Sequence, residues 1–219
     1  MKIMSRQHFL LFVISFSLHA PFLHAQQDWT LKKDENGIKV YSRTSENSKY
    51  NEPRVEMTLQ ASLSSLASLV LDIGNYPNWS FNTKQTSLLK TISPSELYFY
   101  SEIHSPWPAS NRDLAIHLVI SQDPATRVMT IRAEEIPNYI PEKDGLVRVP
   151  LSNEIWTVTP AGNGSIKVDY RIKLDPGANM PAWIINSFSV KGPYETFSHA
   201  RQQLTNARYK DAKLFFIKD

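Results

Sequence analysis

The chain has 219 residues, of which 24 are basic and 21 are acidic, and it contains no cysteine. Nearly balanced charge offers no electrostatic case for nucleic-acid binding, and a chain without cysteine has neither disulfides nor the thiol that a lipoprotein anchor needs. The length suits one domain with a core large enough to enclose a cavity. We therefore expect a single domain, held together by its core alone, with no nucleic-acid partner.

Residues 1–25 have the pattern of a secretory signal peptide. Two basic residues and no acid precede an apolar run over 9–18. That run is too short for the ~20 residues that cross a bilayer as a helix. Ala25 offers a small residue at the cleavage position. We expect cleavage there, a domain over 26–219 and a periplasmic or secreted protein; the alternative is an uncleaved anchor.

A strand and a helix come next along the chain. Val55, Met57 and Leu59 alternate with polar residues, which predicts a strand with one buried face. Ser62 or Ser64 can cap a following helix. Its apolar positions have the i, i+3, i+4, i+7 spacing that forms one helix face: Leu66, Leu69, Val70 and Ile73. The glycine that follows, Gly74, stands where a helix-ending glycine belongs.

Strands dominate the middle of the sequence. We expect them over 97–104, 114–120, 128–133, 154–159 and 166–174, because these runs are apolar or alternate with period two. The first has Leu97, Phe99, Ser101 and Ile103 on one face, and Tyr98, Tyr100, Glu102 and His104 on the other. The second is apolar throughout, so both of its faces should be covered.

A stiff turn connects the first two of these strands. Two prolines flank Trp107, and proline restricts both its own backbone and that of the preceding residue. Arg112 and Asp113 then open an apolar strand, where desolvating a charged pair costs several kcal/mol unless each partner is satisfied. We expect the pair to fix the turn by hydrogen bonds, with direct ligand contact as the alternative. The turn would shape one end of an internal cavity.

Two helices are expected near the C-terminus. A short one over 182–188 would be separated by Lys191 and Gly192 from a longer one with Pro193 in its first turn. The longer helix has an apolar stripe: Tyr194, Phe197, Ala200, Leu204 and Ala207. Strands bracketed by an early and a late helix predict an α+β fold, in which a curved antiparallel sheet holds the C-terminal helix.

Four segments resemble the START family of steroidogenic acute regulatory-related lipid transfer domains. They are Trp29 with Gly37 to Arg43, Tyr76 to Trp79, Pro106 to Asp113 preceded by Glu102, and Leu174 to Asn186. They occur in family order from about Trp29 to the end of the chain. The resemblance implies the helix-grip fold: a curved antiparallel sheet wrapped around a long C-terminal helix. An internal cavity would bind, and could transfer, a lipid or other hydrophobic small molecule through transient membrane contact.

The same resemblance gives candidate ligand-binding residues. Glu102 would be a cavity acid, with an edge carboxylate in water as the alternative. Leu118 stands where many lipid-binding relatives have a cavity arginine, so the cavity should be less polar unless His117 or Arg132 substitutes. The aromatic candidates are Trp107, Trp183, Phe188, Tyr194 and Phe197. They would line the pocket and its lid, with core packing as the alternative. Asn186 would orient the ligand.

No catalytic motif is present in the sequence. The histidines beyond the signal segment, His104, His117 and His199, lack metal-ligand spacing. We expect a monomer with no catalysis, metal or cofactor. Two alternatives stay open. One is a cyclase or hydrolase on the same fold, with acid–base groups drawn from Glu102, His104, His117, Glu134 and Glu135. The other is a structural or partner-binding protein whose cavity is vestigial.

Overall fold

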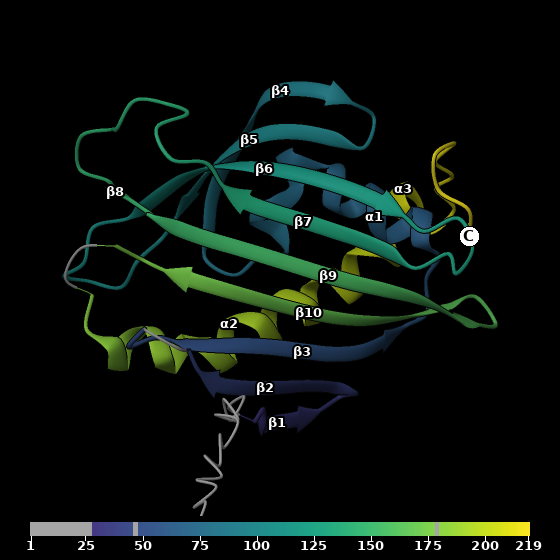
Figure 1. Cartoon of the computed structure of the whole chain (residues 1–219), viewed down its shortest axis with the longest axis horizontal. Coiled ribbons are helices and arrows are strands. Elements are labelled where there is room, and N and C mark those ends of the chain that lie inside the picture. The colour runs from purple at the N-terminus through teal and green to yellow at the C-terminus, as the bar shows by residue number, and fades with distance from the viewer. Residues whose placement is uncertain (1–27, 46–47, 178–179) are drawn as a thin grey trace, which may run out of the picture.

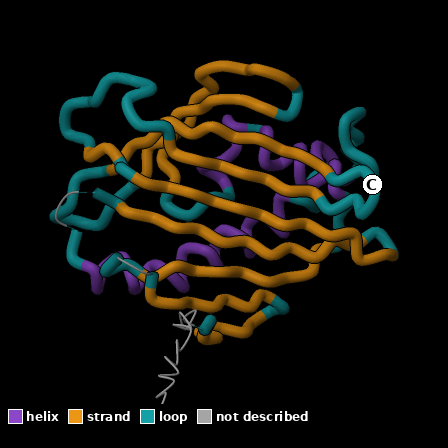
Figure 2. Tube along the Cα trace, viewed as in Figure 1, coloured by secondary structure: helices purple, strands orange, loops and turns teal. Residues whose placement is uncertain are grey.

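The computed structural model describes residues 28–45, 48–177 and 180–219 (Figures 1 and 2). The predicted signal segment, residues 1–25, lies outside the described residues.

One large sheet forms the body of the domain (Figure 1). Its strands pair in the order β1-β2-β3-β10-β9-β7-β6-β5-β4, all antiparallel, and β8 pairs in parallel with β6. The bounds are β1 (Thr30–Glu35), β2 (Ile38–Thr44), β3 (Asn51–Leu59), β4 (Thr83–Ser93), β5 (Glu96–Ile103), β6 (Arg112–Gln122), β7 (Met129–Glu135), β8 (Val147–Arg148), β9 (Leu151–Gly162) and β10 (Ser165–Asp175). Each strand predicted from the sequence corresponds to one of these.

The helices lie on one side of the sheet (Figures 1 and 2). They are α1 (Leu63–Leu71), the 3-10 helix η1 (Ile73–Asn78), α2 (Ala182–Gln203) and α3 (Ala207–Lys210). The hydroxyl of Ser62 caps α1 by accepting a 3.1 Å hydrogen bond from the Ser65 amide. Helix α1 ends at Leu71 and Gly74 lies inside η1, so the glycine stop expected there is wrong. The α+β helix-grip architecture is confirmed.

The two C-terminal helices expected from the sequence are one. Helix α2 continues through Pro193, although proline removes one backbone donor and strains a helix interior. Packing against β2 and β3 outweighs this local cost. A Cβ at Gly192 would lie 3.1 Å from the ring of Phe81, so a residue without a side chain lets the helix approach that ring. The helix break predicted at 191–192 is therefore wrong, and Gly192 is instead the point where α2 comes close to Phe81.

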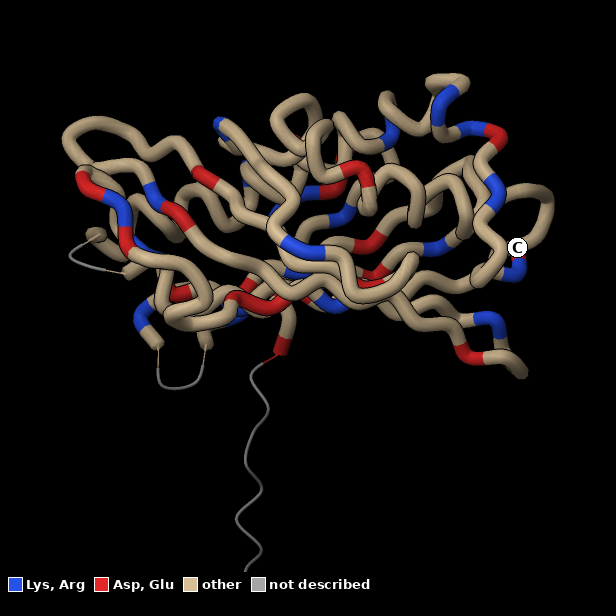
Figure 3. The backbone as a smooth tube through the Cα atoms, turned by 90° about the horizontal axis from the view of Figure 1, so that it is seen from above, with Lys and Arg blue, Asp and Glu red and all other residues tan. Residues whose placement is uncertain are grey.

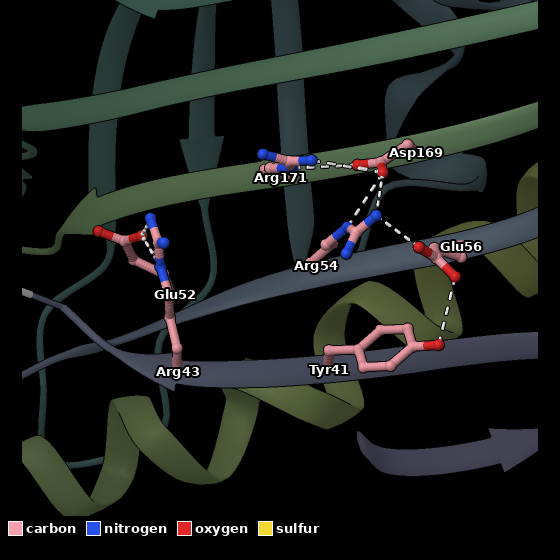
Figure 4. Close-up of polar contacts among 7 residues, drawn as sticks. All are labelled: Tyr41, Arg43, Glu52, Arg54, Glu56, Asp169 and Arg171. Carbon is pink, nitrogen blue, oxygen red and sulfur yellow. Dashed lines mark hydrogen bonds and ion pairs between the residues drawn. The ribbon is translucent and has the colours of Figure 1, made fainter. Parts of the chain in front are cut away.

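The face of the sheet away from α2 carries ion pairs between neighbouring strands β2, β3 and β10 (Figure 4). Arg54 contacts both Asp169 and Glu56, and Tyr41 donates a 3.2 Å hydrogen bond to Glu56. Arg171 also pairs with Asp169, and a separate ion pair joins Arg43 on β2 to Glu52 on β3. Across the described chain, charges of both signs are interspersed (Figure 3). These pairs link neighbouring strands and bring opposite charges together on this face.

A buried ion pair joins β6 to β8. Asp113 is 1% exposed, and its two oxygens accept hydrogen bonds of 2.9 and 3.2 Å from Arg148. Arg148 also donates to the carbonyl oxygens of Ile140 and Pro141. Asp113 therefore holds the segment before β8 against the sheet, a structural role different from the expected one of fixing the β5–β6 turn.

We expect Asp113→Asn to lower the free energy of unfolding by about 3 kcal/mol, because it leaves the Arg148 charge buried without its partner. Urea denaturation would measure the loss. The matched control is Asp34→Asn, which breaks an exposed pair with Lys39 of 3.7 Å and should change stability by less than ~1 kcal/mol. Equal effects of the two changes would contradict the assignment.

Candidate functional site

An apolar cavity of about 260 Å³ lies between the concave face of the sheet and α2. Strands β5, β6, β7, β9 and β10 form one wall, and α2 with the η1–β4 connection forms the other. The side chains that line it are mainly aliphatic and aromatic, such as Phe99, Leu118, Ile131, Ile172, Ile185 and Phe188. This arrangement can remove a hydrophobic molecule from water.

The two ends of the cavity differ. At one end the ring of Phe197, which is fully buried, lies 4.8 Å from that of Trp156 and 5.1 Å from that of Tyr170. This aromatic cluster fills the space between α2 and the sheet. At the other end the wall includes His104, which is also exposed to solvent, together with Pro106. The cavity therefore reaches the surface beside the β5–β6 turn.

Glu102 lies outside the cavity, so its expected position is wrong. The cavity face of β5 carries Phe99, Ser101 and Ile103, whereas Glu102 points to the other face. Its carboxylate accepts hydrogen bonds from Lys84 (2.9 Å), Asn111 (2.8 Å) and Gln85 (2.6 Å). Bonding to Lys84, then Asn111, lowers the pKa of Glu102 to about 2. The side chain belongs to the hydrogen-bond network beside the turn.

That network reaches the turn through Asn111. Its side-chain oxygen accepts a 3.1 Å hydrogen bond from the amide of Ser105, while its amide group donates to Glu102. Glu102 thus supports the β5–β6 turn from the face of the sheet opposite the cavity. These hydrogen bonds explain why an acid that is only 4% exposed is tolerated there.

Arg112 and Leu118 both line the cavity from β6. Arg112 donates to the carbonyl oxygens of Pro176 and Ser110, and none of the described acidic residues forms an ion pair with it. Burial lowers the pKa of its guanidinium. A cation is therefore held in the cavity wall near the mouth, with backbone acceptors as its partners. Leu118 makes the middle of the wall apolar, as the sequence suggested.

His117 does not replace the missing cavity arginine. It lies on the opposite face of β6, 2.8 Å from the Glu96 carboxylate, and its ring stacks on Tyr98 at 4.5 Å. Arg132 is exposed and also lies outside the cavity wall. Both substitutes considered for that arginine are therefore placed elsewhere.

The aromatic candidates divide into three groups. Phe188 lines the cavity, and Phe197 packs in the closed end. Tyr194 lies outside, where its hydroxyl accepts from Asn36. Trp107 and Trp183 are 92% and 73% exposed, so their expected place in the lining is wrong.

Asn186 also lies outside the lining. Its side-chain oxygen accepts a 2.9 Å hydrogen bond from the amide of Asn51, which ties α2 to β3.

Glu154 is a cavity residue that the sequence interpretation missed. It lines the cavity from β9 and is partly buried. Burial raises the pKa of its carboxyl to about 7, partly offset by Tyr170 and Trp156. The signal was available, because Glu154 shares the buried strand face with Trp156 and Val158.

The proposed acid–base groups do not converge in the cavity. Glu102, His117 and Glu134 lie away from it, while His104 stands at its mouth. Within the described ranges, no three His, Asp or Glu side chains are grouped to hold a metal ion. In the same residues no helix has the length and apolar character to cross a membrane. Besides His104 at the mouth, the wall offers Arg112 and Glu154 as ionisable contact points among mainly apolar side chains.

The START domain family model matches residues 22–210. This chain belongs to the START domain family. An uncharacterised protein of Pseudomonas aeruginosa is 34% identical over 176 residues, which cover 80% of this chain and 86% of that protein. The phosphatidylcholine transfer protein of Rattus norvegicus is 26% identical over 165 residues, covering 73% of this chain and 75% of that protein.

Solved structures agree with this assignment. A STAR-related lipid transfer protein fragment from Xanthomonas axonopodis has a TM-score of 0.76 at 32% identity, over 81% of this chain and 99% of that one. Human STARD10 has a TM-score of 0.71 at 19% identity, over 82% of this chain and 74% of that one, and supports the fold alone. The START resemblance found in the sequence is therefore confirmed.

Glu154→Gln should be more stable than the wild type at high pH, and this difference should grow as pH rises. The folded-state pKa of about 7 exceeds the ordinary value of 4.5, so the stability due to the protonated carboxyl is full below about pH 4.5 and lost as pH rises through 7. Glutamine stays neutral throughout. The variant's advantage should therefore grow to about 3 kcal/mol above neutral pH.

Urea denaturation at a series of pH values would measure this difference. Glu134→Gln, on the exposed face of β7, is the matched control and should show no such trend. A constant difference between Glu154→Gln and the wild type across this range would contradict the burial of Glu154.

Proposed function

We propose that this START domain binds a lipid-like hydrophobic molecule in its internal cavity and transfers it between membranes. The apolar cavity that opens beside the β5–β6 turn carries the proposal. Each buried methylene contributes ~0.8 kcal/mol, so a chain of about ten gains roughly 8 kcal/mol before the entropy lost on binding. Such a ligand needs few polar contacts for affinity, and uses them mainly for orientation.

The volume limits the size of the ligand. About 260 Å³ is slightly below the ~300–1,000 Å³ of typical small-molecule pockets. The closed cavity therefore suits a single hydrocarbon chain or a compact ring system. A larger ligand would require α2 to move outward.

The first half of α2 is the part suited to act as a lid. The buried residues of the helix are Ser189, Gly192, Phe197 and Ala200, and none lies in 182–188. The second half is fixed by Phe197 between Trp156 and Tyr170. Opening at the first half would expose the cavity without breaking this cluster.

Two exposed tryptophans support transient contact with a membrane at the mouth. Trp107 follows the lining residue Pro106 in the β5–β6 turn, and Trp183 precedes the lining residue Ile185 in α2. Tryptophan is enriched at membrane–water interfaces, because its ring is apolar and its N–H stays hydrated. The two rings would hold the mouth against the lipid surface during loading and release.

An exported location is part of the proposal. The signal-like segment over 1–25 and the cysteine-free sequence support it. The expected monomer and the cleavage after Ala25 stay predictions. Fractionation of cells with N-terminal sequencing of the protein would test them.

The binding proposal is tested by mass spectrometry of organic extracts from protein purified without detergent. The wild type should release a hydrophobic molecule. Leu118→Trp, which fills the cavity, should lose at least ~90% of it, because the ligand and the indole ring cannot share a space of this size. Val119→Trp places the same ring on the opposite face of β6 and should retain the ligand. An empty wild type that also takes up no added lipid would contradict the proposal.

Membrane contact makes a separate prediction. Replacing Trp107 and Trp183 together by alanine should slow ligand transfer between vesicles by roughly 30-fold, since each lost indole removes on the order of 1 kcal/mol of membrane attachment. Equilibrium binding should stay unchanged. Phe215→Ala is the control, because Phe215 is 89% exposed and its segment adjoins Gln122, at the far end of β6. Equal transfer rates in all three proteins would count against the contact.

A further inference from the structure

Glu154 faces the cavity from the sheet wall. Its cross-strand partners are Ala133 on β7 and Ile172 on β10, and both of these also line the cavity. The pairing places the carboxyl among apolar neighbours in the middle of the wall. No basic residue of the described chain acts on its charge. Glu154 is therefore a partly buried acid that has no ion-pair partner among the described residues.

The polar groups around Glu154 do not use its full bonding capacity. Tyr170 and Trp156 are the polar neighbours that favour its charged form, whereas the hydroxyl of Tyr76 donates to the carbonyl oxygen of Val70 at 2.9 Å. A carboxylate has about four acceptor positions. A purely apolar ligand would leave some of them unsatisfied beside it, at a cost of about tenfold in affinity.

Arg112 provides the second polar contact point, at a different level of the cavity. It donates to the carbonyl oxygen of Pro176, which lies four residues beyond Ile172, the partner of Glu154. At ~3.3 Å per residue, the two levels are about 13 Å apart along β10. The two side chains therefore do not neutralise one another, and apolar lining separates them.

We propose that the cavity selects an amphiphile with two polar groups. An acid or carbonyl group would bind Arg112 near the mouth, and a hydrogen-bond donor such as a hydroxyl would bind Glu154 deeper in the cavity, with hydrocarbon between them. Glu154 is then a specificity-determining residue. This inference rests on the proposed function, and it adds the chemical class of the ligand.

Isothermal titration calorimetry with two acids tests the inference. Dodecanoic acid and ω-hydroxydodecanoic acid differ only by the terminal hydroxyl. The wild type should bind the hydroxylated acid about tenfold more tightly. Glu154→Leu should reverse or abolish this preference while still binding dodecanoic acid, which shows that the variant is folded. Glu154→Gln should retain it, because the amide oxygen still accepts a hydrogen bond.

The outcomes distinguish failure of the role of Glu154 from failure of the proposed binding function. Equal affinities of the wild type for both acids, or a preference that survives in Glu154→Leu, would overturn the role of Glu154 and leave the binding function intact. Failure of the wild type to bind either acid would overturn this inference together with the proposed single-chain ligand. Glu134→Leu is the control for loss of a nearby acid outside the cavity, and should behave as the wild type.

Discussion

Helix α2 fills the concave side of the sheet at one end only, and the remaining features of the domain depend on that packing. Phe197 occupies the space between Trp156 and Tyr170, so the second half of the helix is part of the core. Towards its first half, Gly192 lies against Phe81 and the helix residues contribute to a cavity wall. Opening of the first half would break the hydrogen bond from Asn51 to Asn186 but leave the aromatic cluster intact, so the domain would stay folded.

The strands sort their ionisable groups by face. On the outer face, Glu102, Asp113 and His117 each have close polar partners, which accounts for them structurally. On the cavity face, Arg112 and Glu154 have no ion-pair partner within the described chain. Burying a charged group without a partner is energetically costly. Such groups are therefore found mainly at functional sites, where a ligand completes their bonding. This difference supports the proposal that Arg112 and Glu154 are the charged groups that contact a ligand.

Much of the fold could be predicted from the sequence, because alternation and capping are local. Ser62 caps α1 as expected, and β10 alternates as its sequence indicated. The position of Glu102 could not be settled in this way, since tyrosine on one face of β5 and phenylalanine on the other are both compatible with burial. Glu154 was missed because Ile155 weakens the alternation of β9. Helix α2 continues through Pro193 because of tertiary contacts that no local pattern contains.

The central claim is that a guest molecule occupies the space between the sheet and the first half of α2. A crystal structure of the protein soaked with dodecanoic acid brominated at its terminal carbon tests it most directly, because bromine is located by its anomalous scattering. We predict a bromine peak inside the cavity near Glu154 and the carboxylate near Arg112. Bromine found only on the outer surface, with the cavity filled by rearranged side chains, would contradict the account.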